Sequence, residues 1–141
     1  MIEWLDRIAE KRNTKFKIET CFKEGAWAGA GEPLLYLSGS FSHLVDLETL
    51  YLQKLGACCV AAYNAYLMCS ALPDTQFLAM DARHCAGYEM AEMMAYAASV
   101  GSEAARRERD AVGIIGNANA SCVHLFQILL NISGTSIRAM E

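Results

Sequence analysis

Apolar and polar positions follow different periods in successive parts of the chain, and each period predicts a different element. Residues 1–13 carry apolar positions at helical spacing, which predicts a short amphipathic helix. Polar and apolar residues then alternate over 14–20, a pattern typical of a half-exposed strand, and 33–37 predicts a second strand. Glycines break the stretch between them. We therefore expect two short antiparallel strands joined by glycine-rich turns.

A long helix is expected to begin at Ser42, a residue type that commonly caps helices. Apolar residues recur through it at helical spacing, namely Leu44, Leu47, Tyr51, Leu55 and Cys58, and a second apolar stripe accompanies them. We expect this helix to be buried on most sides and kinked at Gly56. Pro73 and Asp74 predict the turn that follows.

The second half predicts a β-α-β-α series. Residues 76–80 form a short apolar strand, 87–100 favour a helix that ends before Gly101, and 111–116 are apolar enough for a strand covered on both faces. A last helix follows from Val123. The spacing of the two strands fits a right-handed βαβ unit. Two such units begin a parallel barrel or an open α/β sheet, and because an eight-stranded barrel needs about 200 residues or more, this chain cannot close one alone.

Composition and charge exclude several classes of function. The chain of 141 residues is 54% hydrophobic, but charged and amide residues interrupt its most apolar segment, 44–72, so we expect no membrane span. No secretion signal begins the chain, which gives a cytoplasmic location by default. The net charge is −4 and no basic stripe is present, so nucleic acid is not an expected partner. The six cysteines show no metal-binding spacing and are interpreted as reduced, buried thiols.

Polar side chains follow both strands of the second half, and ligands gather at the carboxyl ends of parallel strands. Arg83 and His84 lie in the first of these loops (81–85), and Asn119 and Ser121 lie in the second (117–121). A guanidinium, amides and a hydroxyl suit an anion, which a helix N-terminus also favours. Two structural alternatives remain open: Arg83 pairs with Asp81 or Glu89, and the second loop is only a helix cap. His84 beside Cys85 leaves open a thiol enzyme as well.

Several segments resemble the nicotinate phosphoribosyltransferase family. The stretch 31–39 followed by 47–52 is similar to the family pattern "EP-apolar-G … ET-x-x-L", and 80–87 occupies the place of its "F-G-x-R-x-x-x-G" segment. Residues 113–121 resemble the loop that often runs "G-x-D-x-T-S-N". The resemblance covers roughly residues 20–121 in order and with fitting spacing.

The resemblance implies an α/β fold with a small β-rich N-terminal part and a long helix (1–75), followed by the first two β/α units of an incomplete parallel, TIM-like barrel (76–141). It implies transfer of a phosphoribosyl group from phosphoribosyl pyrophosphate, with Mg²⁺, to nicotinate in NAD salvage, coupled to ATP hydrolysis. Arg83 would lie against the pyridine ring, with His84, Asn119 and Ser121 also at the substrate. A homodimer is common in the family, although the sequence leaves the oligomeric state open.

The chain also departs from the family pattern. No "D-x-Y" segment precedes Thr14, and the family's "G-T-x-x-H" element has no counterpart because Gly134-Thr135 is followed by Ser136, Ile137 and Arg138. We therefore expect a truncated or decayed copy. The alternative hypothesis is a non-catalytic remnant or assembly module that keeps the scaffold.

Overall fold

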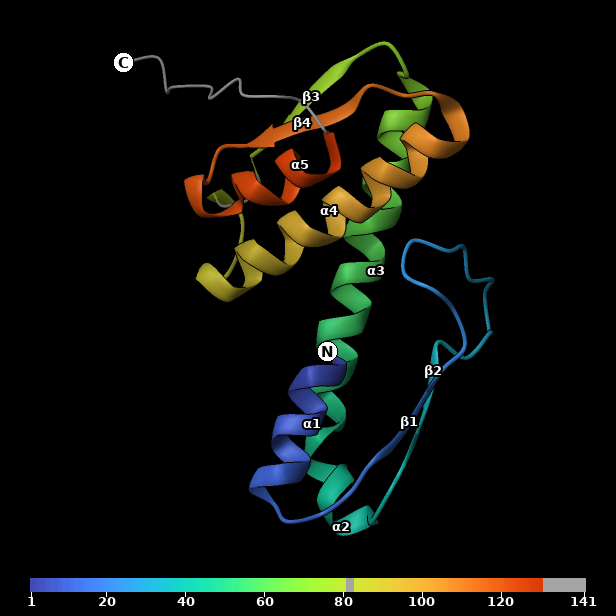
Figure 1. Ribbon diagram of the computed structural model, residues 1–141, viewed down its shortest axis with the longest axis vertical. Coiled ribbons are helices and arrows are strands. Elements are labelled where there is room, and N and C mark those ends of the chain that lie inside the picture. Colours follow the sequence, from blue (N-terminus) through green and yellow to red (C-terminus); the bar gives the residue numbers. More distant parts are fainter. Residues whose placement is uncertain (81–82, 131–141) are drawn as a thin grey trace.

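The computed structural model describes residues 1–80 and 83–130, the last four of them by their backbone alone. Asp81 and the Gly134–Arg138 stretch therefore lie outside the described residues. The fold is a mixture of helices and two small sheets, which confirms the α/β class. One helix, α3, runs through the long axis of the molecule, with α1, β1 and β2 at one end and β3, α4, β4 and α5 at the other (Figure 1).

The N-terminal elements agree with the sequence pattern. Helix α1 spans Ile2–Lys11 and buries Leu5 and Ala9, and strands β1 (Lys17–Thr20) and β2 (Leu35–Ser38) pair antiparallel. The glycine-rich loop between the strands contacts α4, whose Tyr96 hydroxyl donates to Glu24 at 2.5 Å. The expected helix and antiparallel strand pair are thus confirmed.

The expected long helix differs from the prediction in its start and its burial. A short helix α2 (Phe41–Leu44) and a 3-10 turn η1 (Val45–Leu47) precede α3, which spans Glu48–Ala71. At this break, the side chain of Leu47 is buried, with only 2% of it exposed. The prediction that the helix is buried on most sides is wrong, because α4 covers one face and large apolar side chains on other faces stay exposed.

Helix α4 spans Tyr88–Arg109 and does not end near Gly101 as predicted. Gly101 lies inside the helix at its closest approach to α3, where an added Cβ would come within 1.9 Å of the Ala62 carbonyl oxygen. The glycine thus serves helix packing and not helix termination. The helix ends at Asp110, which adopts a left-handed conformation with φ of 54°.

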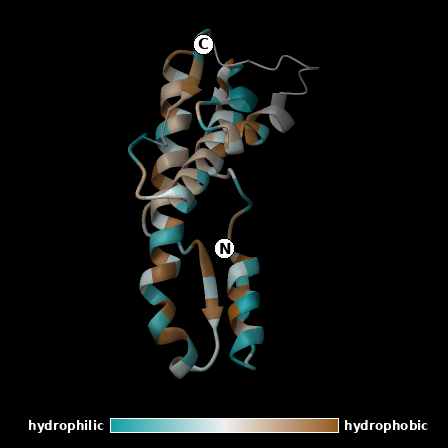
Figure 2. Cartoon of the chain, turned by 90° about the vertical axis from the view of Figure 1, so that its left-hand side faces the viewer, coloured by the Kyte–Doolittle hydropathy of each residue, from teal (hydrophilic) through white to brown (hydrophobic). Residues whose placement is uncertain are grey.

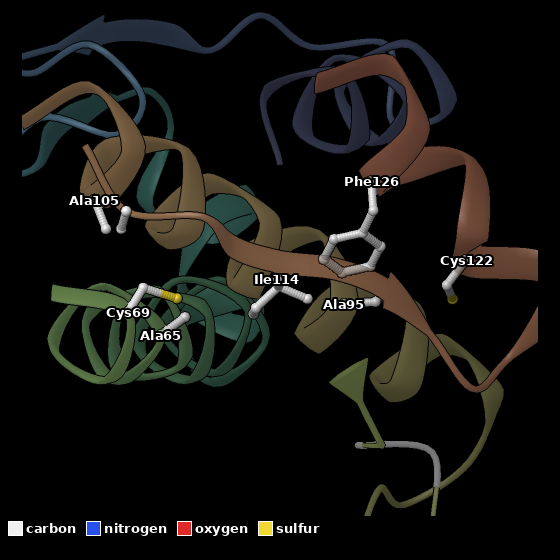
Figure 3. Close-up of a cluster of buried hydrophobic side chains, with 8 residues drawn as sticks. Ala65, Cys69, Ala95, Ala105, Ile114, Cys122 and Phe126 are labelled. Atoms are coloured by element: carbon white, nitrogen blue, oxygen red, sulfur yellow. The ribbon is translucent and has the colours of Figure 1, made fainter. Parts of the chain in front are cut away.

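Strands β3 (Gln76–Ala79) and β4 (Gly113–Asn117) are parallel and are connected through α4, as the sequence predicts. A 3-10 turn η3 (Ala120–Cys122) and helix α5 (Val123–Leu130) follow β4. The main core joins these elements to α3. Figure 3 shows Phe126 of α5 pointing toward Ile114 of β4 and Ala95 of α4, with Cys69 of α3 on the other side of the strand.

In the part of the chain that the structure describes, none of the helices combines the length and the apolar composition needed to cross a membrane.

Candidate functional site

The candidate site lies where the two parallel strands end. Ala79 of β3 is in register with Asn117 of β4, and the Ala118 amide donates to the Ala79 carbonyl at 2.9 Å. The loops after both strands therefore begin at the same edge of the sheet, which is where ligands bind in parallel α/β folds. The structure thus brings together the starts of the two loops that the sequence singles out.

The loop after β4 is ordered by its own side chains. Asn117 is 6% exposed, and its Oδ1 accepts from the Asn119 amide at 2.7 Å. Asn119 Oδ1 in turn accepts from the Ser121 amide at 3.2 Å and from the Ser121 hydroxyl at 2.9 Å. These bonds cap η3, which is the role that Asn and Ser commonly have before a helix. The capping alternative is therefore present, and the half-buried Asn119 and Ser121 keep only part of their hydrogen-bonding capacity for a ligand.

The loop after β3 presents its cation to solvent. Arg83 and His84 are both exposed. Within the described residues, neither side chain forms a hydrogen bond or an ion pair. Of the two carboxylates expected as alternative partners of Arg83, Asp81 lies outside the described residues. The other, Glu89, pairs with Lys54. No described residue therefore competes with an anion for the Arg83 guanidinium, which carries five N–H donors.

The Lys54 ion pair belongs to a separate cleft between α1, α3 and α4. Lys54 Nζ lies 2.5 Å from Glu89 Oε1 and 5.8 Å from the centre of the Trp4 ring. The lysine hydrogen bond lowers the pKa of Glu89 below its usual value, so the carboxylate stays ionised. The cleft has a volume of about 250 Å³ and is also lined by Arg7 and Met93. Because its lysine is already paired with a carboxylate, we interpret these contacts as fastening α1 and α4 to α3.

Sequence reasoning missed a polar contact that fixes the start of β4. The Ser102 hydroxyl of α4 accepts from the Ile114 amide at 2.8 Å, and Arg106 donates to the Ile114 carbonyl at 3.1 Å. Burial lowers the pKa of Arg106. Gly113 makes the approach possible, because its φ is +73° and an added Cβ would lie 2.5 Å from the Ser102 oxygen. The sequence does carry a signal for this contact: Ser102 and Arg106 are four residues apart, on one face of α4, and Gly113 follows the helix.

The cysteines agree only in part with the prediction of buried thiols. Cys69 and Cys122 are buried, whereas Cys21 and Cys59 are exposed. Burial raises the pKa of the Cys58 and Cys69 thiols, which keeps both protonated at neutral pH. The surroundings of these two thiols therefore do not activate them as nucleophiles.

Compared with known proteins, the chain matches no family model, no curated protein and no solved structure.

Proposed function

We propose that the chain is a nicotinate phosphoribosyltransferase-like protein that binds an anionic substrate at the carboxyl ends of β3 and β4. The observation that carries the proposal is the convergence of two polar loops at one sheet edge, with the exposed Arg83 unpaired among the described residues. The order of elements supports it, since β3, α4, β4 and α5 are the β/α units expected from the sequence motifs. The finer part of the proposal is that these units begin an incomplete TIM-like barrel.

The side chains at this edge suit positioning of an anion more than covalent chemistry. Arg83 can hold the nicotinate carboxylate through two parallel hydrogen bonds. Asn119 retains its amide NH₂ as a donor, because the bonds that cap η3 use its oxygen. In a glycosyl transfer through a cationic transition state, the protein mainly orients the reactants and stabilises charge.

The described residues do not fit a resident metal ion. No group of three or more His, Cys, Asp or Glu side chains among them could hold one, and Mg²⁺ prefers carboxylates and phosphate oxygens. In this proposal Mg²⁺ therefore arrives on phosphoribosyl pyrophosphate, and ATP is a co-substrate for which we assign no residue.

The test is formation of nicotinate mononucleotide by purified, monodisperse protein given nicotinate, phosphoribosyl pyrophosphate and Mg²⁺, with and without ATP. Arg83→Ala is expected to abolish the product and weaken nicotinate binding by about tenfold or more, the equivalent of one charge-assisted bidentate contact. Arg107→Ala is the matched control, because Arg107 is exposed near the far end of α4 and pairs with its neighbour Glu108. Equal loss in both variants would contradict a role for Arg83.

The alternative function is a non-catalytic assembly module, and one observation favours it. The apolar side chains exposed on α3 and β3 include Val60 and Leu78, at 61% and 52% exposed. An apolar surface of this kind on a folded chain is typical of an interaction site. A folded sample that neither forms product nor binds nicotinate would support this function over the first.

A further inference from the structure

The cleft between α1, α3 and α4 carries more polar groups than the contacts between its helices use. Its lining includes Trp4 and Arg7 of α1, Lys54 of α3, and Glu89 and Met93 of α4. None of these residues belongs to the two loops of the candidate site. Pockets for drug-sized molecules have volumes of about 300–1,000 Å³, so a cleft of about 250 Å³ has room for a smaller ligand. We call it the α1 cleft.

The charges that line the α1 cleft do not balance. Lys54 pairs with Glu89 at 2.5 Å, and the two charges cancel. Arg7 forms no hydrogen bond or ion pair with any of the described residues. Glu3 is one helical turn before Arg7, at the spacing of a helical ion pair, but the structure does not pair them. The cleft therefore has an excess of one positive charge, on a chain whose net charge is −4.

The exposures of the ion pair show which of its groups is at the mouth of the cleft. The Lys54 side chain is 22% exposed and the Glu89 side chain is 78% exposed, so the carboxylate lies at the mouth and the ammonium lies deeper. Lys54 Nζ also donates to the Met93 sulfur at 3.9 Å. A lysine ammonium has three donors, and these two contacts use two of them. The third donor of Lys54 therefore remains for a ligand, together with the Arg7 guanidinium.

Trp4 and Met93 give the same cleft an apolar wall. Indole rings and thioethers both make favourable contacts with aromatic rings. Trp4 and Arg7 are three residues apart and therefore lie on one face of α1. Bands of hydrophobic and hydrophilic residues alternate along this helix (Figure 2), so it brings an aromatic side chain and a cation to the cleft together. The cleft thus combines a surface for a ring with donors for an anion.

We propose that the α1 cleft binds a small aromatic carboxylate. Arg7 holds the carboxylate of the ligand through two parallel hydrogen bonds, and the remaining Lys54 donor makes a second contact. The ring of the ligand lies against Trp4 and Met93. The ion pair of Lys54 with Glu89 stays intact and keeps α3 and α4 together, so the ligand adds to the contacts between the helices and replaces none of them.

The charge and the size of the cleft argue against other classes of ligand. An aromatic cation would face two cations, Arg7 and Lys54, and would find the Glu89 carboxylate already paired. A neutral ring would bury part of Arg7 without giving it a partner, which costs free energy. A nucleotide needs more space than this cleft has, and its phosphates would meet the Glu89 carboxylate at the mouth. A monoanion of one or two rings is the class that fits.

Titration of the whole chain with phenylacetate, followed by ligand-observed NMR, tests the proposal. We expect a dissociation constant on the order of 1 mM, since small ligands in open clefts bind weakly, and no saturable binding of the uncharged phenylacetamide. Arg7→Ala is expected to raise the dissociation constant by about tenfold or more, the loss of one charge-assisted bidentate contact. Lys11→Ala is the matched control and should change nothing, because Lys11 carries the same charge on the same helix but does not line the cleft. Absence of phenylacetate binding, or equal binding of the two ligands, would overturn the proposal.

Two further measurements locate the bound ligand. The chain has two tryptophans, so Trp27→Phe leaves Trp4 as the only one, and phenylacetate is expected to change its fluorescence. Arg83→Ala should leave the affinity for phenylacetate unchanged, because Arg83 does not line the cleft. Loss of binding in Arg83→Ala with full binding in Arg7→Ala would place the ligand at the edge of the β3–β4 sheet and overturn the proposal. Arg7 is exposed, so circular dichroism should show an intact fold in its variant. None of these readouts uses nicotinate turnover, so the result for the cleft is independent of the proposed function.

Discussion

At the scale of single residues, two helical glycines with opposite surroundings give the sharpest prediction. Gly101→Ala puts a methyl group into the Ala62 backbone and is expected to lower the free energy of unfolding by about 3 kcal/mol or more. Gly56→Ala meets nothing within 4 Å and should raise it by about 0.5–1 kcal/mol, because alanine restricts the unfolded chain. Urea denaturation measures both. Equal effects would mean that α3 and α4 are not in close contact.

The Arg12–Asp46 ion pair, also at the residue scale, predicts a pH dependence. Arg12 donates to both Asp46 oxygens, at 2.8 and 2.7 Å, and this hydrogen bonding lowers the pKa of Asp46 below its ordinary 3.8. The pair therefore contributes stability at pH values above 3.8, and that contribution is lost as the pH falls through the lowered pKa. Asp46→Asn should unfold more readily than the parent at neutral pH.

The difference in thermal midpoint between parent and Asp46→Asn should shrink as the solution is acidified below this range. Glu19→Gln is the control, because among the described residues the ion pair of Glu19 is with Lys17, on the same exposed strand. A difference that is constant down to strong acid would show that the carboxylate charge does not stabilise the fold.

At the scale of elements, a buried hydroxyl of α4 bonds to the first residues of β4. Ser102 is 3% exposed and accepts from the Ile114 amide. Ser102→Ala leaves that buried amide without its acceptor, at a cost of about 1–3 kcal/mol. Faster amide hydrogen exchange at Ile114 is the specific readout. Ser99→Ala is the matched control, since Ser99 is equally buried but donates to the Tyr96 carbonyl of its own helix; it should leave Ile114 exchange unchanged.

The same elements show what could be predicted from the sequence. Local patterns were sufficient to predict the presence and order of α1, of the β1–β2 pair and of β3-α4-β4, because the periodicity of each element is visible within a few residues. The end of α4 was not predictable, since Gly101 has its role through Ala62, which is distant in sequence. The exposure of α3 was missed for the same reason: a helix apolar on all sides does not show which side the chain itself covers. At the candidate site, the meeting of two loops followed from strand order, but the bonding of Asn119 to Ser121 required coordinates.

At the scale of the whole molecule, α3 joins two ends whose buried cores differ in size. The end that contains β4 has a continuous core of residues from α3, α4, β4 and α5. At the other end, residues 1–47 contain only three buried apolar side chains, Leu5, Ala9 and Leu47. Regions with fewer buried apolar contacts open at lower free energy than the global unfolding reaction. The N-terminal end should therefore open first.

Paired substitutions in the two ends test this order of opening. Leu5 is fully buried and Phe126 is 2% exposed, so each truncation to alanine removes core packing, at a cost of about 2–5 kcal/mol. Leu5→Ala should accelerate amide exchange and proteolysis in residues 1–47 while leaving Ile114 protected, because the β4 core does not depend on α1. Phe126→Ala should accelerate exchange in β4 and α4 and lower the global unfolding midpoint. If Leu5→Ala exposes Ile114 to the same extent, the two ends unfold as one cooperative unit, and α3 transmits stability along its whole length.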